Sequence, residues 1–186
     1  CDTAGQTVGF GTAPGQMSIS VAGTQGFSNT AGIKFNDAGK CGNMAVNGAD
    51  FSNVINTITI NAKRDASTLS FTSGGTSSFH ELKAYGDSGI LVNGTVVTTH
   101  GSLFLNGDAD SAIGSDTPNK ITLASGSMLQ SKTVLTLMAQ TGSIERAGTL
   151  TLTTGTGIQI HNDLASTGAA KELVLIAGTE VDNQGE

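Results

Sequence analysis

The chain contains no tryptophan, one tyrosine, two prolines and two cysteines among its 186 residues. Its apolar runs are all too short for a membrane-spanning helix. The 9 Lys+Arg are outnumbered by the 15 Asp+Glu, so the net charge is −6 and the basic surface of a nucleic-acid-binding protein is missing. A hydrophobic content of 37% argues against a disordered chain. These absences predict a folded domain with no nucleic-acid partner and no transmembrane segment.

Small polar residues and glycine take the place of charge. The 26 Gly, 25 Thr, 18 Ser and 12 Asn occupy 81 of the 186 positions, whereas charged residues make up 13%. A surface rich in Thr, Ser and Asn stays soluble without networks of ion pairs, which is typical of secreted proteins. The length corresponds to a single domain with a real core. We therefore expect an extracellular or cell-surface location.

Short stretches of alternating apolar and polar residues recur along the chain, and helix patterns are nearly absent. The commonest form is apolar-Thr-apolar, as in Ile121-Thr-Leu123, Leu135-Thr-Leu137 and Leu150-Thr-Leu152. A period of two places both aliphatic side chains on one face of a strand and the β-branched threonine on the other. The pattern predicts many short strands.

Turn-forming residues separate these strands. Three Asn-Gly pairs, at Asn47-Gly48, Asn93-Gly94 and Asn106-Gly107, are expected to supply left-handed backbone positions. Because Asn-Gly also closes two-residue hairpins, an antiparallel β-sandwich remains the second choice of fold.

Self-similarity favours a solenoid. The segments 134–144 and 149–158 are variants of one phrase, which is the signature of a repeat protein. Coils of about 20–25 residues that stack about 4.8 Å apart would give about eight coils and a rod about 40 Å long. The first choice of fold is therefore an all-β parallel β-helix, with irregular coils or a capping element over 1–56 and regular solenoid coils over 57–186.

The phrases at 135–144 and 150–164 resemble the repeats of bacterial filamentous-haemagglutinin-type exoproteins, over residues 57–181 well and over 1–56 poorly. Those proteins are secreted adhesins with shafts that are right-handed parallel β-helices, so the resemblance implies that handedness here. Degenerate repeats of this kind also occur in autotransporter passengers and other surface filaments.

One departure from that family concerns secretion. Its secretion domain carries an Asn-Pro-Asn-Gly or Asn-Pro-Asn-Leu motif, and neither Pro14 nor Pro118 lies in one. The resemblance therefore implies a piece of the shaft of a longer bacterial protein rather than its secretion signal.

Acidic residues provide the main candidate site. Asp108, Asp110 and Asp116 lie in one loop and could begin a calcium site, although Ala112 stands where an EF-hand would place a third oxygen ligand. The alternative is a solvated loop between two coils. Polysaccharide cleavage would need two carboxylates on one groove, and sugar-binding grooves use aromatic platforms that a chain with Tyr85 alone and no Trp does not offer.

Histidine and cysteine offer no catalytic pattern. His80, His100 and His161 lie far apart in the sequence without a partner at metal-ligand spacing, and we expect them beside strand ends. Cys1 and Cys41 admit three interpretations: free thiols, a disulfide that requires an oxidising compartment, or lipidation of Cys1. We therefore expect no enzyme and, calcium apart, no cofactor.

Three functions follow from these expectations. The first is a structural, non-catalytic segment of a secreted or cell-surface bacterial β-solenoid that acts in adhesion or fibre assembly. Its partners would be copies of itself or neighbouring coils of a longer chain, together with a host or matrix glycan or protein. The second is a polysaccharide-binding or polysaccharide-cleaving β-helix protein. The third is an ice-binding solenoid. Its Thr-x-Thr sets argue against this function, because they are irregularly spaced and an ice-binding face needs an even lattice.

Overall fold

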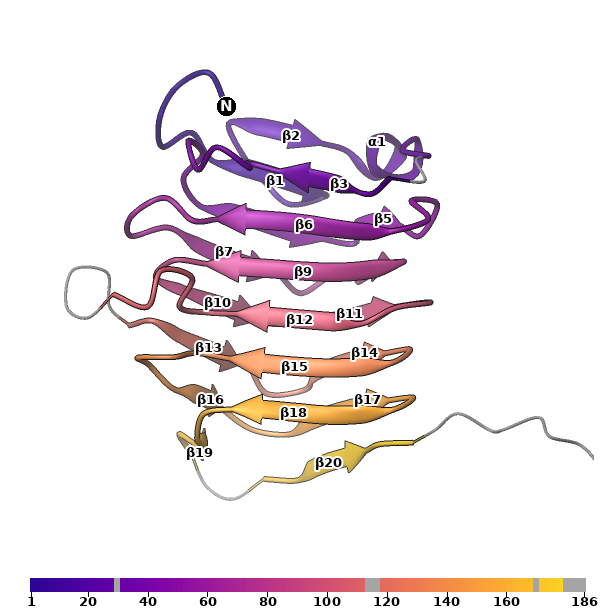
Figure 1. The fold of residues 1–186 in the computed structure, drawn as a ribbon, viewed down its shortest axis with the longest axis vertical. Coiled ribbons are helices and arrows are strands. Elements are labelled where there is room, and N and C mark those ends of the chain that lie inside the picture. The colour runs from indigo at the N-terminus through magenta and orange to yellow at the C-terminus, as the bar shows by residue number, and fades with distance from the viewer. Residues whose placement is uncertain (29–30, 113–117, 169–170, 179–186) are drawn as a thin grey trace, which may run out of the picture.

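A computed structural model describes residues 1–28, 31–112, 118–168 and 171–178 (Figure 1). Twenty short strands and one short helix form the regular structure of these residues. The strands lie in three sheets, which we call sheets I, II and III. The eight strands of sheet I are β1 (Val8–Gly11), β2 (Met17–Ile19), β4 (Met44–Asn47), β7 (Thr68–Phe71), β10 (Gly89–Val92), β13 (Lys120–Leu123), β16 (Ile144–Arg146) and β19 (Leu164–Ser166).

Sheets II and III have six strands each. Sheet II contains β5 (Asp50–Phe51), β8 (Thr76–Phe79), β11 (Thr95–Thr98), β14 (Ser127–Ser131), β17 (Leu150–Thr154) and β20 (Leu173–Ile176). Sheet III contains β3 (Ile33–Phe35), β6 (Thr57–Ala62), β9 (Glu81–Gly86), β12 (Leu103–Asn106), β15 (Val134–Met138) and β18 (Gly157–His161).

The chain visits the three sheets in turn. From β4 to β18 it passes through sheets I, II and III five times in that order, with partial rounds before and after (Figure 1). All strand pairs of the described residues are parallel. The protein is therefore all-β with three long parallel sheets, as a parallel β-helix requires, and the antiparallel sandwich is wrong. Five full rounds with a partial round at each end are fewer than the expected eight coils.

The register places equivalent side chains directly over one another. In sheet I, one ladder consists of Met44, Leu69, Ile90, Ile121 and Ile144. Successive members lie close to one expected repeat length apart in the sequence, except for Ile90 and Ile121. Between those two positions lies the longer segment that connects β12 to β13, of which residues 113–117 are outside the described residues. The predicted repeat length therefore corresponds to one round of the chain. Rounds differ in length because the segments between the strands differ in length.

The core lies between the three sheets. In β15, Leu135 and Leu137 are fully buried, whereas Thr136 between them faces outward and is half-buried. The apolar-Thr-apolar phrases are thus confirmed as strands with one buried face. Burial of these aliphatic side chains, at roughly 1.5–3 kcal/mol each, is the main force that holds successive rounds together.

One inner ladder of sheet II changes from aromatic to hydroxyl side chains. Phe51 stacks on Phe79 with ring centroids 5.6 Å apart, and Phe79 is in register with Thr98 of the next round. Thr98 is buried, and its hydroxyl donates to the Gly101 carbonyl at 2.7 Å. The Ser131 hydroxyl likewise donates to the Val134 carbonyl at 3.0 Å. Each of these two buried hydroxyls is therefore satisfied by a turn carbonyl, which removes the cost of burying a polar group.

The N-terminal end of the stack is covered by α1 (Val21–Gln25), whose N-cap is Ser20. The helix packs against β1 and β5. Its buried Thr24 accepts a hydrogen bond from the Asp50 amide at 3.1 Å. The Asp50 carboxylate accepts from the hydroxyl and amide of Ser52, which hold its pKa below the usual range.

Beneath this helix the aromatic residues gather. Phe10, Phe27, Phe35 and Phe51 contact one another with ring centroids 4.8 to 6.0 Å apart. A disulfide joins Cys1 to Cys41 at the same end. The N-terminal part of the chain thus closes one end of the aliphatic core with aromatic side chains, a helix and a crosslink.

The Asn-Gly pairs differ from the expectation in two of three cases. Gly48 has a φ of +58°, as predicted, whereas Gly94 and Gly107 do not have positive φ values. At these two positions the neighbouring round approaches closely instead. A Cβ on Gly107 would lie 2.7 Å from the Lys120 carbonyl oxygen, and one on Gly94 would lie 3.0 Å from that of Thr72. Glycine is needed there for space rather than for backbone conformation.

The inward and outward positions of β15 give a matched pair of substitutions. We expect Leu137→Ala to lower the free energy of unfolding by about 2–5 kcal/mol, because it leaves a cavity in a fully packed ladder. Thr136→Ala, one residue away on the outer face, should change it by less than about 0.5 kcal/mol. Urea unfolding followed by circular dichroism measures both. Equal losses would contradict the assignment of the two faces.

Removal of the disulfide tests the role of the N-terminal end. The bridge closes a loop with a sequence separation of 40, and loop-closure entropy then gives about 4 kcal/mol of stabilisation. We expect Cys1→Ser/Cys41→Ser to lose stability of this order in urea unfolding. The wild-type chain in reductant is the control and should behave like the variant. Unchanged stability in both would show that the bridge does not constrain the unfolded chain.

Candidate functional site

The outer face of sheet III carries an ordered row of side chains. Lys34 of β3, Thr59 of β6, Lys83 of β9 and Phe104 of β12 are in register on successive rounds. They face outward because the residues on either side of each belong to the inward-facing ladders. Figure 1 shows this sheet facing the viewer, with its rounds stacked from β3 down to β18.

A shallow hollow of about 620 Å³ opens at the N-terminal part of this face. Three lysines line it, Lys34, Lys63 and Lys83, and the Lys63 ammonium lies 4.0 Å from the centroid of the Tyr85 ring. This distance is that of a cation–π contact, which orients the lysine over the strand. The remaining lining is mostly polar and consists of Ala31, Gly32, Ile33, Asp37, Asn56, Thr57, Thr59 and Asn61.

Asn61 also lines the hollow, but its side-chain oxygen is buried in the protein. Its side chain is 4% exposed, and Oδ1 has no hydrogen-bond partner among the described residues. A buried amide oxygen without a donor costs about 1–3 kcal/mol. The hollow therefore combines three lysines with a mostly polar lining, and the buried oxygen of Asn61 is not accessible from it.

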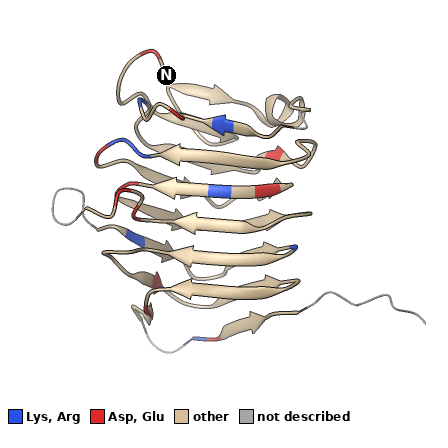
Figure 2. Cartoon of the chain, viewed as in Figure 1, with Lys and Arg blue, Asp and Glu red and all other residues tan. Residues whose placement is uncertain are grey.

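Charge is concentrated on few parts of the molecule. Figure 2 shows blue segments on β3 and β9 of the facing sheet and in the turn after β6, with red segments also on β9 and in that turn, whereas the strands below β9 on this face are tan. Lys34 contacts Asp37 at 3.8 Å, but both side chains are about two-thirds exposed, so solvent screens this pair. The hollow is thus locally cationic on a chain with a net charge of −6.

The other end of the stack is open. Leu173 and Leu175 of β20 are in register with the buried Leu150 and Leu152, and so continue two core ladders. They are nevertheless 37% and 50% exposed. In the part of the chain that the structure describes, β20 is the last strand of sheet II and no further strand pairs with its free edge. This end presents core positions and unpaired backbone groups, unlike the covered N-terminal end.

The acidic loop does not assemble a metal centre in the described residues. Asp108 is fully buried, and its Oδ2 accepts from the Thr141 amide while Oδ1 has no partner in this part of the chain. Asp110 accepts from the Ala112 amide at 2.9 Å. Asp116, the third candidate ligand, lies outside the described residues. Within the described ranges no three His, Cys, Asp or Glu residues are placed to share a metal ion.

Two of the histidines come together, contrary to their wide separation in the sequence. The rings of His80 and His100 stack with centroids 4.4 Å apart and planes 4° apart. They follow β8 and β11, which are adjacent in sheet II. Their separation in the sequence equals one round of the chain, so the repeat length is the signal that pairs them. Lys34 and Lys83 are two repeat lengths apart, so the repeat length also groups these two lysines. Local sequence patterns do not single them out.

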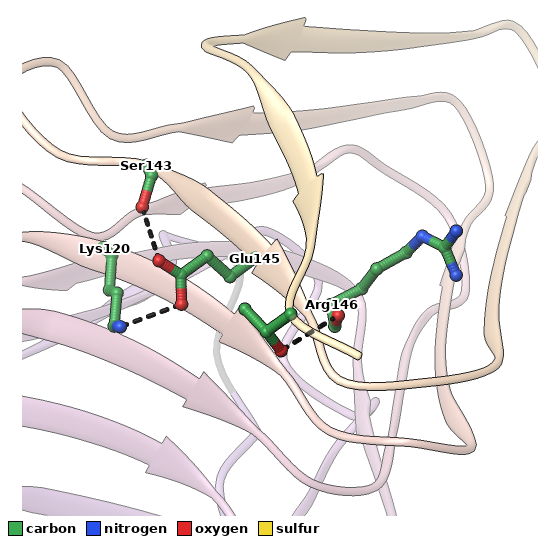
Figure 3. Close-up of polar contacts among 5 residues, drawn as sticks. Lys120, Ser143, Glu145 and Arg146 are labelled. Atoms are coloured by element: carbon green, nitrogen blue, oxygen red, sulfur yellow. Dashed lines mark hydrogen bonds and ion pairs between the residues drawn. The ribbon is translucent and has the colours of Figure 1, made fainter. Parts of the chain in front are cut away.

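An ion pair lies on the outer face of sheet I. Lys120 of β13 donates to Glu145 of β16 at 2.8 Å, and the Ser143 hydroxyl donates to the same carboxylate at 3.0 Å (Figure 3). The ammonium of Lys120 is the main reason that the pKa of Glu145 lies below its usual range. Arg146, next along β16, instead donates to the carbonyls of Gly148 and Lys171. These contacts link neighbouring rounds, so the charged groups of Lys120, Glu145 and Arg146 have a structural role.

Comparison of the chain with family models, curated proteins and solved structures found no match. No helix of the described residues is long and apolar enough to cross a membrane.

The Lys120–Glu145 pair predicts a pH-dependent contribution to stability. Lys120→Gln should lower the free energy of unfolding at pH 7 by about 0.2–1 kcal/mol. Because the pKa of Glu145 is lowered on folding, the pair stabilises above the unfolded glutamate pKa of about 4.3, and the effect is lost as the pH falls through the folded pKa below it.

Urea titrations at pH 7 and at pH 3 measure the difference between the two proteins. It should shrink at the lower pH. Lys171→Gln, which removes the same charge from an exposed position, is the control and should leave stability unchanged. A difference that persists at pH 3 would contradict the ionic origin.

Proposed function

We propose that the chain is a structural, non-catalytic segment of a secreted or cell-surface bacterial β-solenoid, acting in adhesion or extracellular fibre assembly. The observation that carries the proposal is the contrast between the two ends. One end of the core is covered by α1 and its aromatic cluster, and the other exposes Leu173 and Leu175 at core positions. A stack built in this way can be extended at one end by more rounds of the same kind.

The three parallel sheets support a finer description of the fold as a right-handed parallel β-helix. The order of visits to the three sheets repeats five times in one direction. Parallel connections of this type are overwhelmingly right-handed. The likeness of the repeats to those of filamentous-haemagglutinin-type exoproteins supports the same handedness and a role as part of a shaft.

The absence of a catalytic role is supported by what the candidate groups already do. Asp108 and Asp110 accept hydrogen bonds from backbone amides, and Glu145 is engaged by Lys120. Glycoside cleavage requires two carboxylates facing one groove. The hollow on sheet III is instead lined by three lysines and one aspartate as its charged residues.

Extension would occur by strand addition at β20. A neighbouring round would cover the exposed parts of Leu173 and Leu175, which is worth about half or less of the roughly 1.5–3 kcal/mol for burial of a fully exposed leucine, and would pair the free edge. A second copy or neighbouring coils of a longer chain could supply it. In the first case the N-terminal end of the second copy is covered, so the two copies would meet through their β20 ends, and this isologous contact gives a dimer.

Assembly of this kind is concentration-dependent and can be measured. We expect light scattering coupled to size exclusion to show a rising mass as the protein is concentrated, and electron microscopy to show elongated particles. Leu173→Lys/Leu175→Lys should remain monomeric, because a charge on an open edge opposes strand addition. Urea unfolding should confirm that the variant is folded.

Ile55→Lys is the matched control, since Ile55 is 59% exposed but lies outside β20. It should assemble as the wild-type chain does. Monomers at all concentrations, or equal loss of assembly in the control, would contradict the proposal.

A further inference from the structure

Basic side chains converge on the hollow of sheet III. Lys34, Lys63 and Lys83 are three of only nine Lys+Arg in the chain, and all three line it. Its one lining carboxylate, Asp37, is 70% exposed and pairs with Lys34 at 3.8 Å, so it neutralises little of the local charge. A net charge of −6 repels acidic partners elsewhere, which directs an anion to this face.

Two of the three lysines lie one above the other along the stack. Lys34 and Lys83 occupy the same ladder, with Thr59 on the round between them. Neighbouring strands are about 4.8 Å apart, so the two backbone positions are separated by about 9.6 Å parallel to the long axis. This geometry fits an extended polymer with negative charges that recur at about this spacing.

The polar lining indicates what kind of polymer this is. Thr57 and Thr59 of β6 line the hollow and add hydroxyl groups to it. Polyhydroxylated units would exchange hydrogen bonds with these hydroxyl groups. Tyr85, the single aromatic ring among the lining residues, is engaged by the Lys63 ammonium 4.0 Å from its centroid. Recognition therefore depends on charge and hydrogen bonds rather than on stacking.

We propose that this hollow binds an acidic polysaccharide along the axis of the stack, with Lys34 and Lys83 contacting successive anionic groups. The inference rests on the adhesive role proposed above and names its ligand class. Binding and assembly are separate measurements, so loss of this site leaves the assembly result unaffected.

The test uses the full chain and three defined polymers in biolayer interferometry at low salt. Polygalacturonate presents carboxylates, dextran sulfate presents sulfates and dextran presents neither. We expect binding to at least one anionic polymer, weakened by added salt, and none to dextran. The tighter of the two anionic polymers identifies the anion. Binding to dextran at equal strength, or binding to neither anionic polymer, would overturn the proposal.

Paired variants locate the binding on the molecule. Lys34→Gln/Lys83→Gln should weaken binding at least tenfold. Lys132→Gln/Lys171→Gln removes the same charge from exposed positions outside the hollow and should weaken it less than twofold. Equal losses in the two variants would show that net charge alone is responsible, and would overturn the assignment.

A gain-of-function variant separates recognition from folding. Thr59→Lys inserts a lysine between Lys34 and Lys83 on the same ladder and should tighten binding several-fold. A merely structural role of this face predicts no gain. A single-stranded oligothymidylate of similar length is the specificity control. Binding to it as tight as to the best polysaccharide would contradict a carbohydrate ligand.

Discussion

The parallel pairing of each strand with its equivalents in the rounds before and after is the constraint on which the rest of the structure depends. Parallel ladders satisfy backbone groups only if successive rounds keep the same register. The side chain at each inner position must then pack on its counterpart, as Leu69, Ile90 and Ile121 do. Loops can vary in length outside the ladder, and the segment between β12 and β13 does so without disturbing it.

The same constraint makes the two ends unequal. A stack of this kind always leaves a terminal round with uncovered core positions and a free edge. At one end, α1 and the aromatic residues around Phe51 cover the core positions of the terminal round, and the disulfide supports this cover. At the other, Leu175 continues a core ladder but is half exposed. The proposed assembly follows from this difference rather than from any catalytic group.

Register also organises the outer surface, because residues far apart in the sequence become neighbours on successive rounds. Lys34 and Lys83 enter a common row in this way, and the rings of His80 and His100 become stacked. A small set of charges can thus be concentrated on one face of an acidic chain. The cationic hollow is a product of stacking, since no local segment contains it.

The apolar-Thr-apolar phrases were sufficient to determine strands with one buried face and a repeating all-β architecture. They also gave the approximate length of a round, because the strand period and the repeat length can both be read along the sequence. The parallel direction of the pairs, the reason for glycine at Gly94 and Gly107, and the grouping of lysines around Asn61 were decided only by the tertiary structure. Each depends on which residues meet between rounds. Loop lengths set that register, and no pattern within a single segment specifies it.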